Sequence, residues 1–334
     1  KNWNAKKVVQ WLVVKIKKFN FSVHTFSLRT KLMTIISKDI QKAIALLTNE
    51  ELVAIPTETV YGLAGNIFSE KAIKNIFETK KRPFFNPLIV HIYSVDFLSD
   101  IVSEVPEKAK LLANAFWPGS MTLVLKKNKN IPDIITANKD TVAVRIPNHP
   151  ITLELLQKLP FPLAAPSANP FNQISPTKPE HVYRYFKNDI QMVLDGGACK
   201  NGIESTIIGF ENNEPIIYRL GALALEDIEA VVGEITIKNS EKENIEAPGM
   251  LDKHYSPKTK TVLTSTILTE IKKYPNKQVG VLAFNTSYNS DKITTEIILS
   301  TTSNLKEAAS KLYDSLHQLD HLDLDVIIAE KLPE

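Results

Sequence analysis

LVAIPTETVYGLAGN, residues 52–66, is the stretch that best indicates how this chain folds. Its first four residues are an uninterrupted apolar run of the length of a buried strand, and Pro56 ends it because proline has no N–H for a sheet ladder. The hydroxyl-rich segment PTETVYGL, 56–63, follows directly. Polar groups clustered after a strand are typical of ligand sites in open α/β sheets, although Pro, Thr and Gly also form ordinary turns.

Strand-like and helix-like segments alternate along the chain from Met33 onward. Apolar residues at helical spacing follow Ile40, and a second such stripe follows Ser69, which can cap a helix. This rhythm predicts an α/β fold with one large twisted mixed sheet. Further apolar runs predict strands at 88–92, 121–125, 141–146, 162–165, 192–194, 205–210 and 215–220.

A change of composition predicts two domains joined by a linker. We expect residues 33–237 to form the large α/β domain, and 238–258, which contains KNSEKENIEAPG, to be a polar linker. A β-α-β pattern beyond it predicts a small Rossmann-like C-terminal domain over 259–334. Because the chain ends directly after its last apolar run, we expect this domain to be truncated.

Positive charge is concentrated at the N-terminus. The whole chain has 40 Lys and Arg against 37 Asp and Glu, but residues 1–32 contain eight basic side chains and no acid, so the rest carries a net charge of −5. We expect translation to start at Met33 and 1–32 to be an upstream extension, with an organelle-targeting peptide as the alternative. Because the rest of the chain is mildly acidic, its overall charge does not indicate a nucleic-acid-binding protein.

Composition also limits the compartment. With 43% hydrophobic and 23% charged residues, the chain has the make-up of a globular protein, and no uncharged apolar run has the length of a membrane-spanning helix. Cys199 is the single cysteine, so an internal disulfide cannot form. We interpret Cys199 as structural and predict a cytoplasmic protein without a membrane partner.

Common nucleotide and catalytic motifs are not found in the sequence. There is no GxxxxGK[ST] loop, no GxGxxG after a strand and no HExxH, so a bound nucleotide would be held in another way. Ser175 and Lys178 match the SxxK of penicillin-binding enzymes. Thr177 and Glu180, however, form a capping-box pattern that predicts a helix start at Thr177, which places Ser175 outside the helix.

Three groups of basic side chains suit an anionic ligand. Alternation in TVAVRI places Arg145 and Thr141 opposite the aliphatic residues of that strand, and His91 lies opposite its own aliphatic neighbours. A guanidinium grips a carboxylate or phosphate in a fork, while Lys80 and Arg82 would supply further positive charge. A solvent-facing Arg, a satisfied core His and a basic helix end are the alternative interpretations.

Eight ordered motifs resemble the YrdC-like threonylcarbamoyl-AMP synthase family, in its long form with a C-terminal domain. The resemblance covers about residues 33–334. The motifs are PTETVYGLAGN (56–66), KKRPFFNPLIVHI (80–92), WPGSMTLVL (117–125), VAVRIPNHP (142–150), PLAAPSANP (162–170) with SPT (175–177), GIESTI (202–207), YRLGAL (218–223) and APGMLDKHYSP (247–257).

The resemblance implies a reaction and its partners. Members of the family make L-threonylcarbamoyl-AMP and pyrophosphate from L-threonine, bicarbonate and ATP, with Mg²⁺ accompanying the nucleotide and without a protein metal site. A partner complex, the tRNA threonylcarbamoyl-transferase, then uses the product to form N6-threonylcarbamoyladenosine in tRNA, so weak tRNA binding is also implied.

The resemblance further implies roles for individual residues, with Lys80 and Arg82 at the centre of catalysis. The ATP-binding residues would be Lys80, Arg82, Asn86, Thr141, Asn169, Thr177, Arg219 and Tyr255, the last as part of a lid formed by the linker. The threonine-binding residues would be Thr59, His91, Arg145, Ser167 and Ser205.

Two other functions remain open from the sequence. The same fold could serve as a non-catalytic module that binds double-stranded RNA or tRNA, although pockets rich in Ser and Thr suit a small ligand better. It could also transfer a carbamoyl group from carbamoyl phosphate.

Overall fold

The computed structural model describes residues 33–238 and 256–333. The basic N-terminal segment, Tyr255 and most of the predicted linker therefore lie outside the described residues, and the expectations for them stay predictions.

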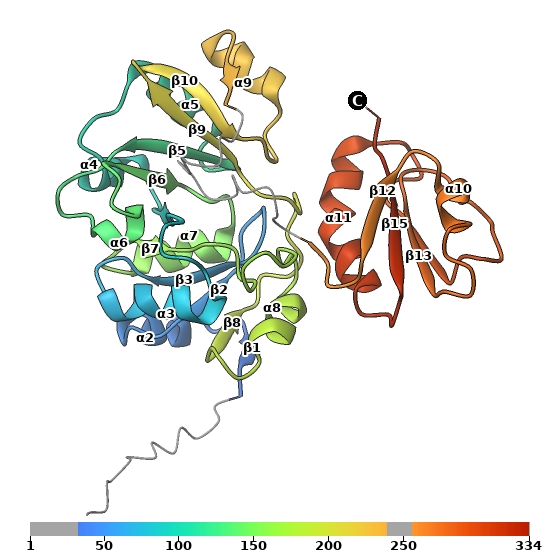
Figure 1. Ribbon diagram of the computed structural model, residues 1–334. Coiled ribbons are helices and arrows are strands. Elements are labelled where there is room, and N and C mark those ends of the chain that lie inside the picture. The colour runs from blue at the N-terminus through green and yellow to red at the C-terminus, as the bar shows by residue number, and fades with distance from the viewer. Residues whose placement is uncertain (1–32, 239–255, 334) are drawn as a thin grey trace, which may run out of the picture. The chain divides into compact units, whose positions relative to one another are not determined.

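A mixed sheet organises the larger part of the described chain (Figure 1). Its eleven strands follow the order β1-β8-β2-β3-β7-β4-β6-β5-β9-β10-β11, with both parallel and antiparallel pairs, which confirms the predicted α/β class. The strands are β1 (Ile35–Ser37), β2 (Val53–Ile55), β3 (Gly62–Asn66), β4 (Ile89–His91), β5 (Met121–Lys126), β6 (Thr141–Arg145), β7 (Leu163–Ala164), β8 (Met192–Leu194), β9 (Thr206–Glu211), β10 (Glu214–Arg219) and β11 (Thr236–Ile237).

Helices cover both faces of this sheet. Buried side chains of α2 and α7 belong to one apolar core, and those of α3, α5, α8 and α9 belong to another. The helical segments are α2 (Ile40–Thr48), α3 (Glu70–Lys80), the 3₁₀ turn η1 (Val95–Phe97), α4 (Leu98–Ile101), α5 (Glu107–Phe116), α6 (Asp133–Thr136), α7 (Pro150–Lys158), α8 (Pro179–Phe186) and α9 (Leu225–Val232).

Strand β3 was not predicted, because its sequence GLAGN contains two glycines that weaken any strand signal. Its place in the sheet explains one of them. A side chain on Gly65 would lie 3.2–3.3 Å from atoms of Leu52, Ala72 and Ile76, so the backbone of β3 approaches α3 closely. The polar turn between β2 and β3 is thereby fixed against the sheet.

The two predicted helix caps have different outcomes. Ser69 caps α3 as expected, with its side chain accepting a hydrogen bond from the Ala72 N–H. The predicted start of a helix at Thr177 is wrong, because α8 begins at Pro179 with Lys178 as its N-cap. Proline suits the first helical position, so the residue directly before it takes the capping place.

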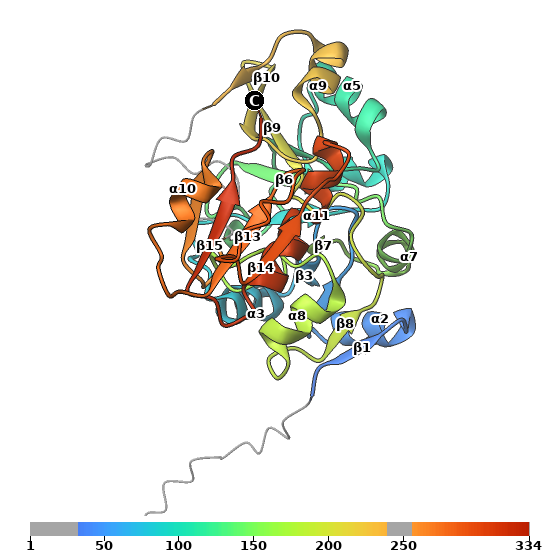
Figure 2. The ribbon, with the colours of Figure 1, turned by 90° about the vertical axis from the view of Figure 1, so that its right-hand side faces the viewer.

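A second, smaller sheet follows (Figure 2). Its four strands run parallel in the order β12-β15-β13-β14, which confirms the expected small parallel α/β unit. The elements are β12 (Thr261–Thr264), α10 (Ile267–Ile271), β13 (Val279–Ala283), β14 (Thr295–Ile298), α11 (Leu305–Leu319) and β15 (Val326–Glu330).

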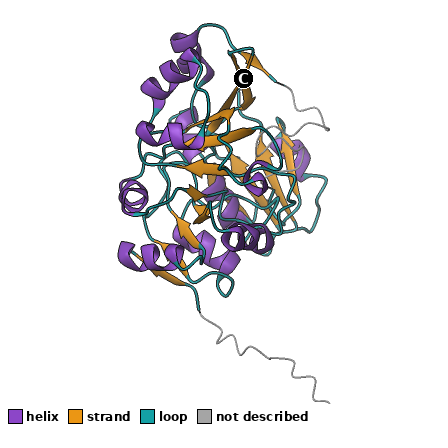
Figure 3. Ribbon diagram, turned by 90° about the vertical axis from the view of Figure 1, so that its left-hand side faces the viewer, coloured by secondary structure: helices purple, strands orange, loops and turns teal. Residues whose placement is uncertain are grey.

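Helices, strands and loops are distinguished by colour in Figure 3. Within the described ranges, no helix has both the length and the apolarity that crossing a membrane would require.

Shortening a β3 side chain tests the importance of the core. Leu63 is completely buried, so Leu63→Ala is expected to reduce the free energy of unfolding by about 2–5 kcal/mol. Urea denaturation would measure the change. Phe68→Ala is the control, since Phe68 lies just beyond β3 with half of its surface exposed and should change stability by less than about 0.5 kcal/mol.

Candidate active site

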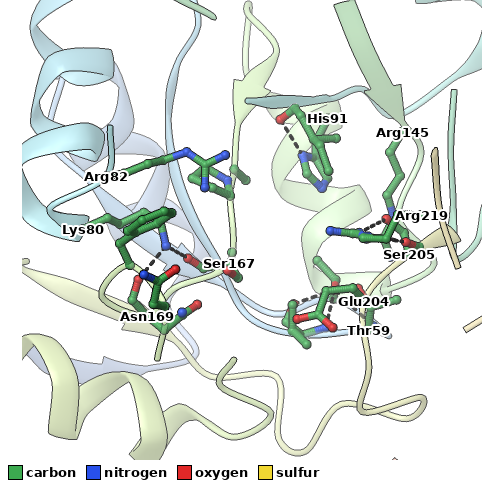
Figure 4. Close-up of a pocket in the computed structure, with 18 residues that line it drawn as sticks. Thr59, Lys80, Arg82, His91, Arg145, Ser167, Asn169, Glu204, Ser205 and Arg219 are labelled. Atoms are coloured by element: carbon green, nitrogen blue, oxygen red, sulfur yellow. Dashed lines mark hydrogen bonds between the residues drawn. The ribbon is translucent and has the colours of Figure 1, made fainter. Parts of the chain in front are cut away.

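One pocket brings together most of the predicted site residues (Figure 4). It has a volume of about 650 Å³ including its open mouth. Turns and strand ends from distant parts of the sequence form its wall. The predicted residues that line it are Thr59, Lys80, Arg82, His91, Arg145, Ser167, Asn169, Ser205 and Arg219.

Lys80 and Arg82 lie on either side of the sharp turn that ends α3. Lys81 adopts the left-handed conformation with φ of 52°, which reverses the chain. Lys80 Nζ donates to the carbonyl oxygens of Ser167 and Asn169, the second at 2.5 Å. Complete burial, followed by the nearby Arg82 charge, lowers the Lys80 pKa well below its usual value. A polyphosphate beside Lys80 would favour the charged form again.

The Arg82 side chain is oriented by the loop that follows it. Its Nη2 donates to the Pro87 carbonyl at 2.7 Å and its Nε to the Asn86 carbonyl at 3.1 Å. Carbonyl groups therefore orient both Lys80 and Arg82 without cancelling their charge.

His91 and Arg145 are direct partners in the register of the parallel strands β4 and β6. Burial, and then the nearby Arg145 guanidinium, lowers the pKa of His91 to about 3. His91 is therefore a neutral imidazole at physiological pH, and it can take part in hydrogen bonds to a ligand without adding charge.

Glu58 is a buried partner of Arg145 that the sequence analysis missed. Its Oε1 accepts from Arg145 Nη2 at 2.6 Å, while Arg145 Nε donates to the Gly119 carbonyl at 3.1 Å. Glu58 also accepts from the Asn148 N–H at 2.9 Å and from Ser120 Oγ at 3.0 Å. Part of the guanidinium predicted to hold a substrate carboxylate is thus already used by the protein.

Glu58 stays ionised in this environment. Burial alone would raise its pKa, but the adjacent Arg145 charge and the hydrogen bonds from Arg145 and Asn148 lower the pKa below its usual range. A signal for Glu58 was present in the sequence, because it is a single acid inside a turn whose neighbours are apolar or hydroxyl-bearing.

Arg219 and Ser205 form a second cluster on the pocket wall. Arg219 Nη2 donates to the Ser205 carbonyl at 2.7 Å and lies 3.2 Å from Ser205 Oγ, which is 2.8 Å from Thr122 Oγ1. Glu204, which was also missed, lines the pocket beside them. Among the described residues that line the pocket, Glu204 is the one acid.

Four predicted residues are not in the pocket lining as described. Asn86 and Thr177 are close in the sequence to residues that line the pocket. Both are buried, and each has a side-chain polar group without a hydrogen-bond partner in the described structure. Thr141 lines a separate hollow with Lys126 and Phe210. It shares a strand face with Arg145, but four residues at about 3.3 Å each place it ~13 Å away. Tyr255 lies outside the described residues.

A protein-bound metal is not indicated by the donor set. Within residues 33–238 and 256–333, no three His, Cys, Asp or Glu side chains are grouped so that they could hold an ion. Asn169 offers an unpaired, buried Oδ1 atom beside Lys80, which suits a ligand that brings a hydrogen-bond donor.

Fold and pocket together define a class of protein, an α/β ligand-binding protein whose basic pocket suits small anionic substrates. Residues 45–221 match the Sua5/YciO/YrdC family, described as "Telomere recombination", and residues 223–334 match the family "Threonylcarbamoyl-AMP synthase, C-terminal domain". The chain therefore belongs to the Sua5/YciO/YrdC family of threonylcarbamoyl-AMP synthases, as its motifs predict.

Relatives match nearly the whole chain. Threonylcarbamoyl-AMP synthase of Pyrococcus abyssi is 40% identical, covering 88% of this chain and 89% of its own, and that of Bacillus subtilis is 39% identical, covering 88% of each. The crystal structure of P. abyssi Sua5 complexed with L-threonine superposes with a TM-score of 0.84 at 38% identity, covering 90% of this chain and 93% of its own. Escherichia coli YciO, at 22% identity and a TM-score of 0.53 over 59% of this chain and all of its own, shares the fold.

Removing the Glu58 charge tests the buried ion pair. Glu58→Gln leaves the Arg145 charge buried without its partner, so it is expected to lower the free energy of unfolding at pH 7 by about 3–5 kcal/mol. Glu104→Gln is the control, because its pair with Lys126 is about half exposed on both sides and should be worth at most ~1 kcal/mol.

The difference between wild type and Glu58→Gln should depend on pH. A carboxyl whose pKa is lower in the folded state stabilises the fold above its unfolded pKa, here the usual 4.5, and this contribution disappears as the pH falls through the folded value. Denaturation at several pH values between 7 and 3 would measure it. A difference that stays constant over this range would contradict the assignment.

Proposed function

We propose that this protein synthesises L-threonylcarbamoyl-AMP and pyrophosphate from L-threonine, bicarbonate and ATP, for the modification of tRNA. One observation carries the proposal: Lys80, Arg82, Arg145 and Arg219, from three separate motifs, line a single pocket. The threonine carboxylate, bicarbonate and a triphosphate together need such a concentration of positive charge. The threonylcarbamoyl-AMP synthases of P. abyssi and B. subtilis, each about 40% identical over 88% of the chain, support the same reaction.

We assign the Lys80 side of the pocket to the nucleotide. Lys80, Arg82 and Arg219 would meet the phosphates, and the free Oδ1 of Asn169 would accept from a group of the nucleotide. Asn86 and Thr177, with their unpaired buried atoms, would complete this side after a small rearrangement of their loops. Mg²⁺ would arrive bound to ATP, as it commonly does, and would neutralise phosphate charge.

We assign the His91 side to threonine. Arg145 would pair with its carboxylate, neutral His91 would take part in a hydrogen bond, and Thr59, Ser167 and Ser205 would surround the rest of the amino acid. The P. abyssi Sua5 structure is described as a complex with L-threonine, which supports an amino-acid site in this fold.

The reaction then relies more on the positioning of its substrates than on a covalent nucleophile from the protein. The threonine ammonium group first releases a proton to solvent. The free amine then attacks the carbon of bicarbonate, a C–N bond forms and water leaves, which gives a carbamate. A carbamate oxygen next attacks the α-phosphorus, and the bond to the departing pyrophosphate breaks. Holding the two reacting groups together and neutralising the leaving pyrophosphate are the tasks of the basic side chains.

Further parts of the proposal concern partners and location. A threonylcarbamoyl-transferase complex would receive the product, tRNA would bind weakly if at all, and the cytoplasm would be the compartment. The lid role of Tyr255 and the domain limits 33–237, 238–258 and 259–334 likewise stay predictions. A non-catalytic RNA-binding role is not favoured, because the named relatives are synthases.

Product formation tests the proposal directly. The protein is incubated with MgATP, L-threonine and ¹⁴C-bicarbonate, and the labelled adenylate is separated by chromatography. We expect label in threonylcarbamoyl-AMP together with an equal amount of pyrophosphate, and neither when threonine is left out. Label-free adenylate or ADP as the product would exclude the reaction.

Substitution of Arg145 tests the division of the pocket. Arg145→Ala is expected to weaken threonine binding by roughly 30- to 1000-fold, because a bound carboxylate loses an ionic partner worth about 2–4 kcal/mol. Arg145→Lys should recover only part of the loss, since an ammonium lacks the fork. Calorimetric titration with threonine and with a non-hydrolysable ATP analogue would measure both sides.

The exposed Arg184, on α8, provides the control substitution Arg184→Ala, which should leave both affinities unchanged. If Arg145→Ala weakened the nucleotide as much as threonine while the protein stayed folded, Arg145 would belong to the phosphate side.

A further inference from the structure

Glu204 differs in the sign of its charge from the other ionisable side chains that line the pocket. Lys80, Arg82, Arg145 and Arg219 line the same space, and the guanidinium groups among them would repel a substrate ammonium group. Among the described lining residues, Glu204 is the one acid, and Figure 4 draws it below Arg219 and Ser205. A zwitterionic amino acid presents both signs of charge, so an acid in its site would complement the α-ammonium group.

Neutral donors hold the Glu204 carboxylate in place. Its Oε1 accepts from Ser175 Oγ at 2.5 Å, and its Oε2 accepts from the Tyr313 hydroxyl at 2.6 Å. The described residues offer Glu204 no ion pair within 4 Å, so its negative charge is fixed in position but not cancelled. Each carboxylate oxygen can accept a second hydrogen bond, which leaves capacity for a ligand.

The backbone of Glu204 is equally constrained. Its carbonyl accepts from the Ala222 N–H at 2.8 Å, and a side chain on Gly221 would lie 2.4 Å from that same oxygen. Glu204 therefore has little freedom to turn away from the pocket.

Tyr313 comes from the second sheet region, on helix α11. One turn further along α11, His317 Nε2 lies 3.1 Å from the carbonyl oxygen of Ser175, the residue whose hydroxyl bonds Glu204. Two residues of α11 thus hold the Glu204 carboxylate, one directly and one through Ser175. This gives the C-terminal region a direct connection to the pocket wall.

We propose that Glu204 receives the α-amino group of the amino-acid substrate, and that Tyr313 is a positioning residue that keeps the Glu204 carboxylate in place. The assignment rests on the proposed function, because it takes L-threonine as the ligand of this pocket. It adds a contact for the ammonium group and a role for α11.

A ligand without the amino group tests the assignment. L-Threonine and (2S,3R)-2,3-dihydroxybutanoate, which has a hydroxyl in place of the amine, are titrated calorimetrically into the full chain with a non-hydrolysable MgATP analogue present. In Glu204→Gln, threonine affinity should fall about 10- to 100-fold, while affinity for the hydroxy acid should stay within about twofold of wild type. Glu204→Asp, which keeps the charge on a shorter side chain, should recover part of the threonine affinity.

The positioning role of Tyr313 has a separate readout. Tyr313→Phe removes the hydrogen bond to Glu204 but keeps the ring, so threonine affinity should fall about 3- to 10-fold without a change for the hydroxy acid. Tyr288→Phe is the matched control, because Tyr288 packs against the core of the second sheet region and its substitution should affect neither ligand.

Three results would overturn the proposal. Equal losses for both ligands would make Glu204 an architectural residue, and unchanged affinity for both would remove it from the amino-acid site. A Tyr313→Phe protein that binds threonine like wild type would remove the positioning role. Failure of wild type to bind threonine at all would instead overturn the proposed function, on which the assignment rests.

Discussion

The ion pair between Arg145 and Glu58 is the constraint on which the pocket depends. It joins the turn between β2 and β3 to the end of β6, and Arg145 Nε extends the connection to the carbonyl of Gly119. Both side chains are almost completely buried, so neither can leave without exposing an uncompensated charge in the interior. The turn that carries Thr59 is therefore held at one distance from the strand ends that carry His91 and Arg145, and the pocket keeps its width.

Backbone carbonyl oxygens orient the other basic side chains of the pocket. Lys80 and Arg82 are oriented by backbone carbonyl oxygens, and Arg219 donates to the Ser205 carbonyl. Carbonyl dipoles satisfy donors but carry no net charge, so these particular contacts do not offset the charge of the side chains. Arg145 differs in that the carboxylate of Glu58 fixes its direction at the expense of part of its charge.

Sequence patterns predicted the sheet better than the pocket. Strands expected at 88–92, 121–125 and 141–146 correspond to β4, β5 and β6, because continuous aliphatic runs have few other uses. Strand β3 was missed because its glycines allow close packing, Gly65 against α3 and Gly62 against Ala165 and Pro166, and leave no strand signal. Alternation correctly separated Arg145 from the aliphatic face, but it could not show that Thr141, on the same face, lies about 13 Å away in another hollow.

The acids were the hardest residues to predict, and the reason is general. Glu58 and Glu204 are held by Arg145 and Tyr313, which lie 87 and 109 positions away in the sequence. A local sequence pattern cannot indicate contacts between residues so far apart. A buried carboxylate beside a guanidinium becomes part of the framework, whereas one held by hydroxyl groups keeps a charge that can still attract a cation. Glu58 and Glu204 thus have different roles, and the difference follows from their donors, a guanidinium for Glu58 and hydroxyl groups for Glu204. One of the two donors to Glu204, Tyr313, belongs to α11, so a residue of the second sheet region holds a carboxylate on the wall of a pocket whose lining residues lie between Thr57 and Arg219.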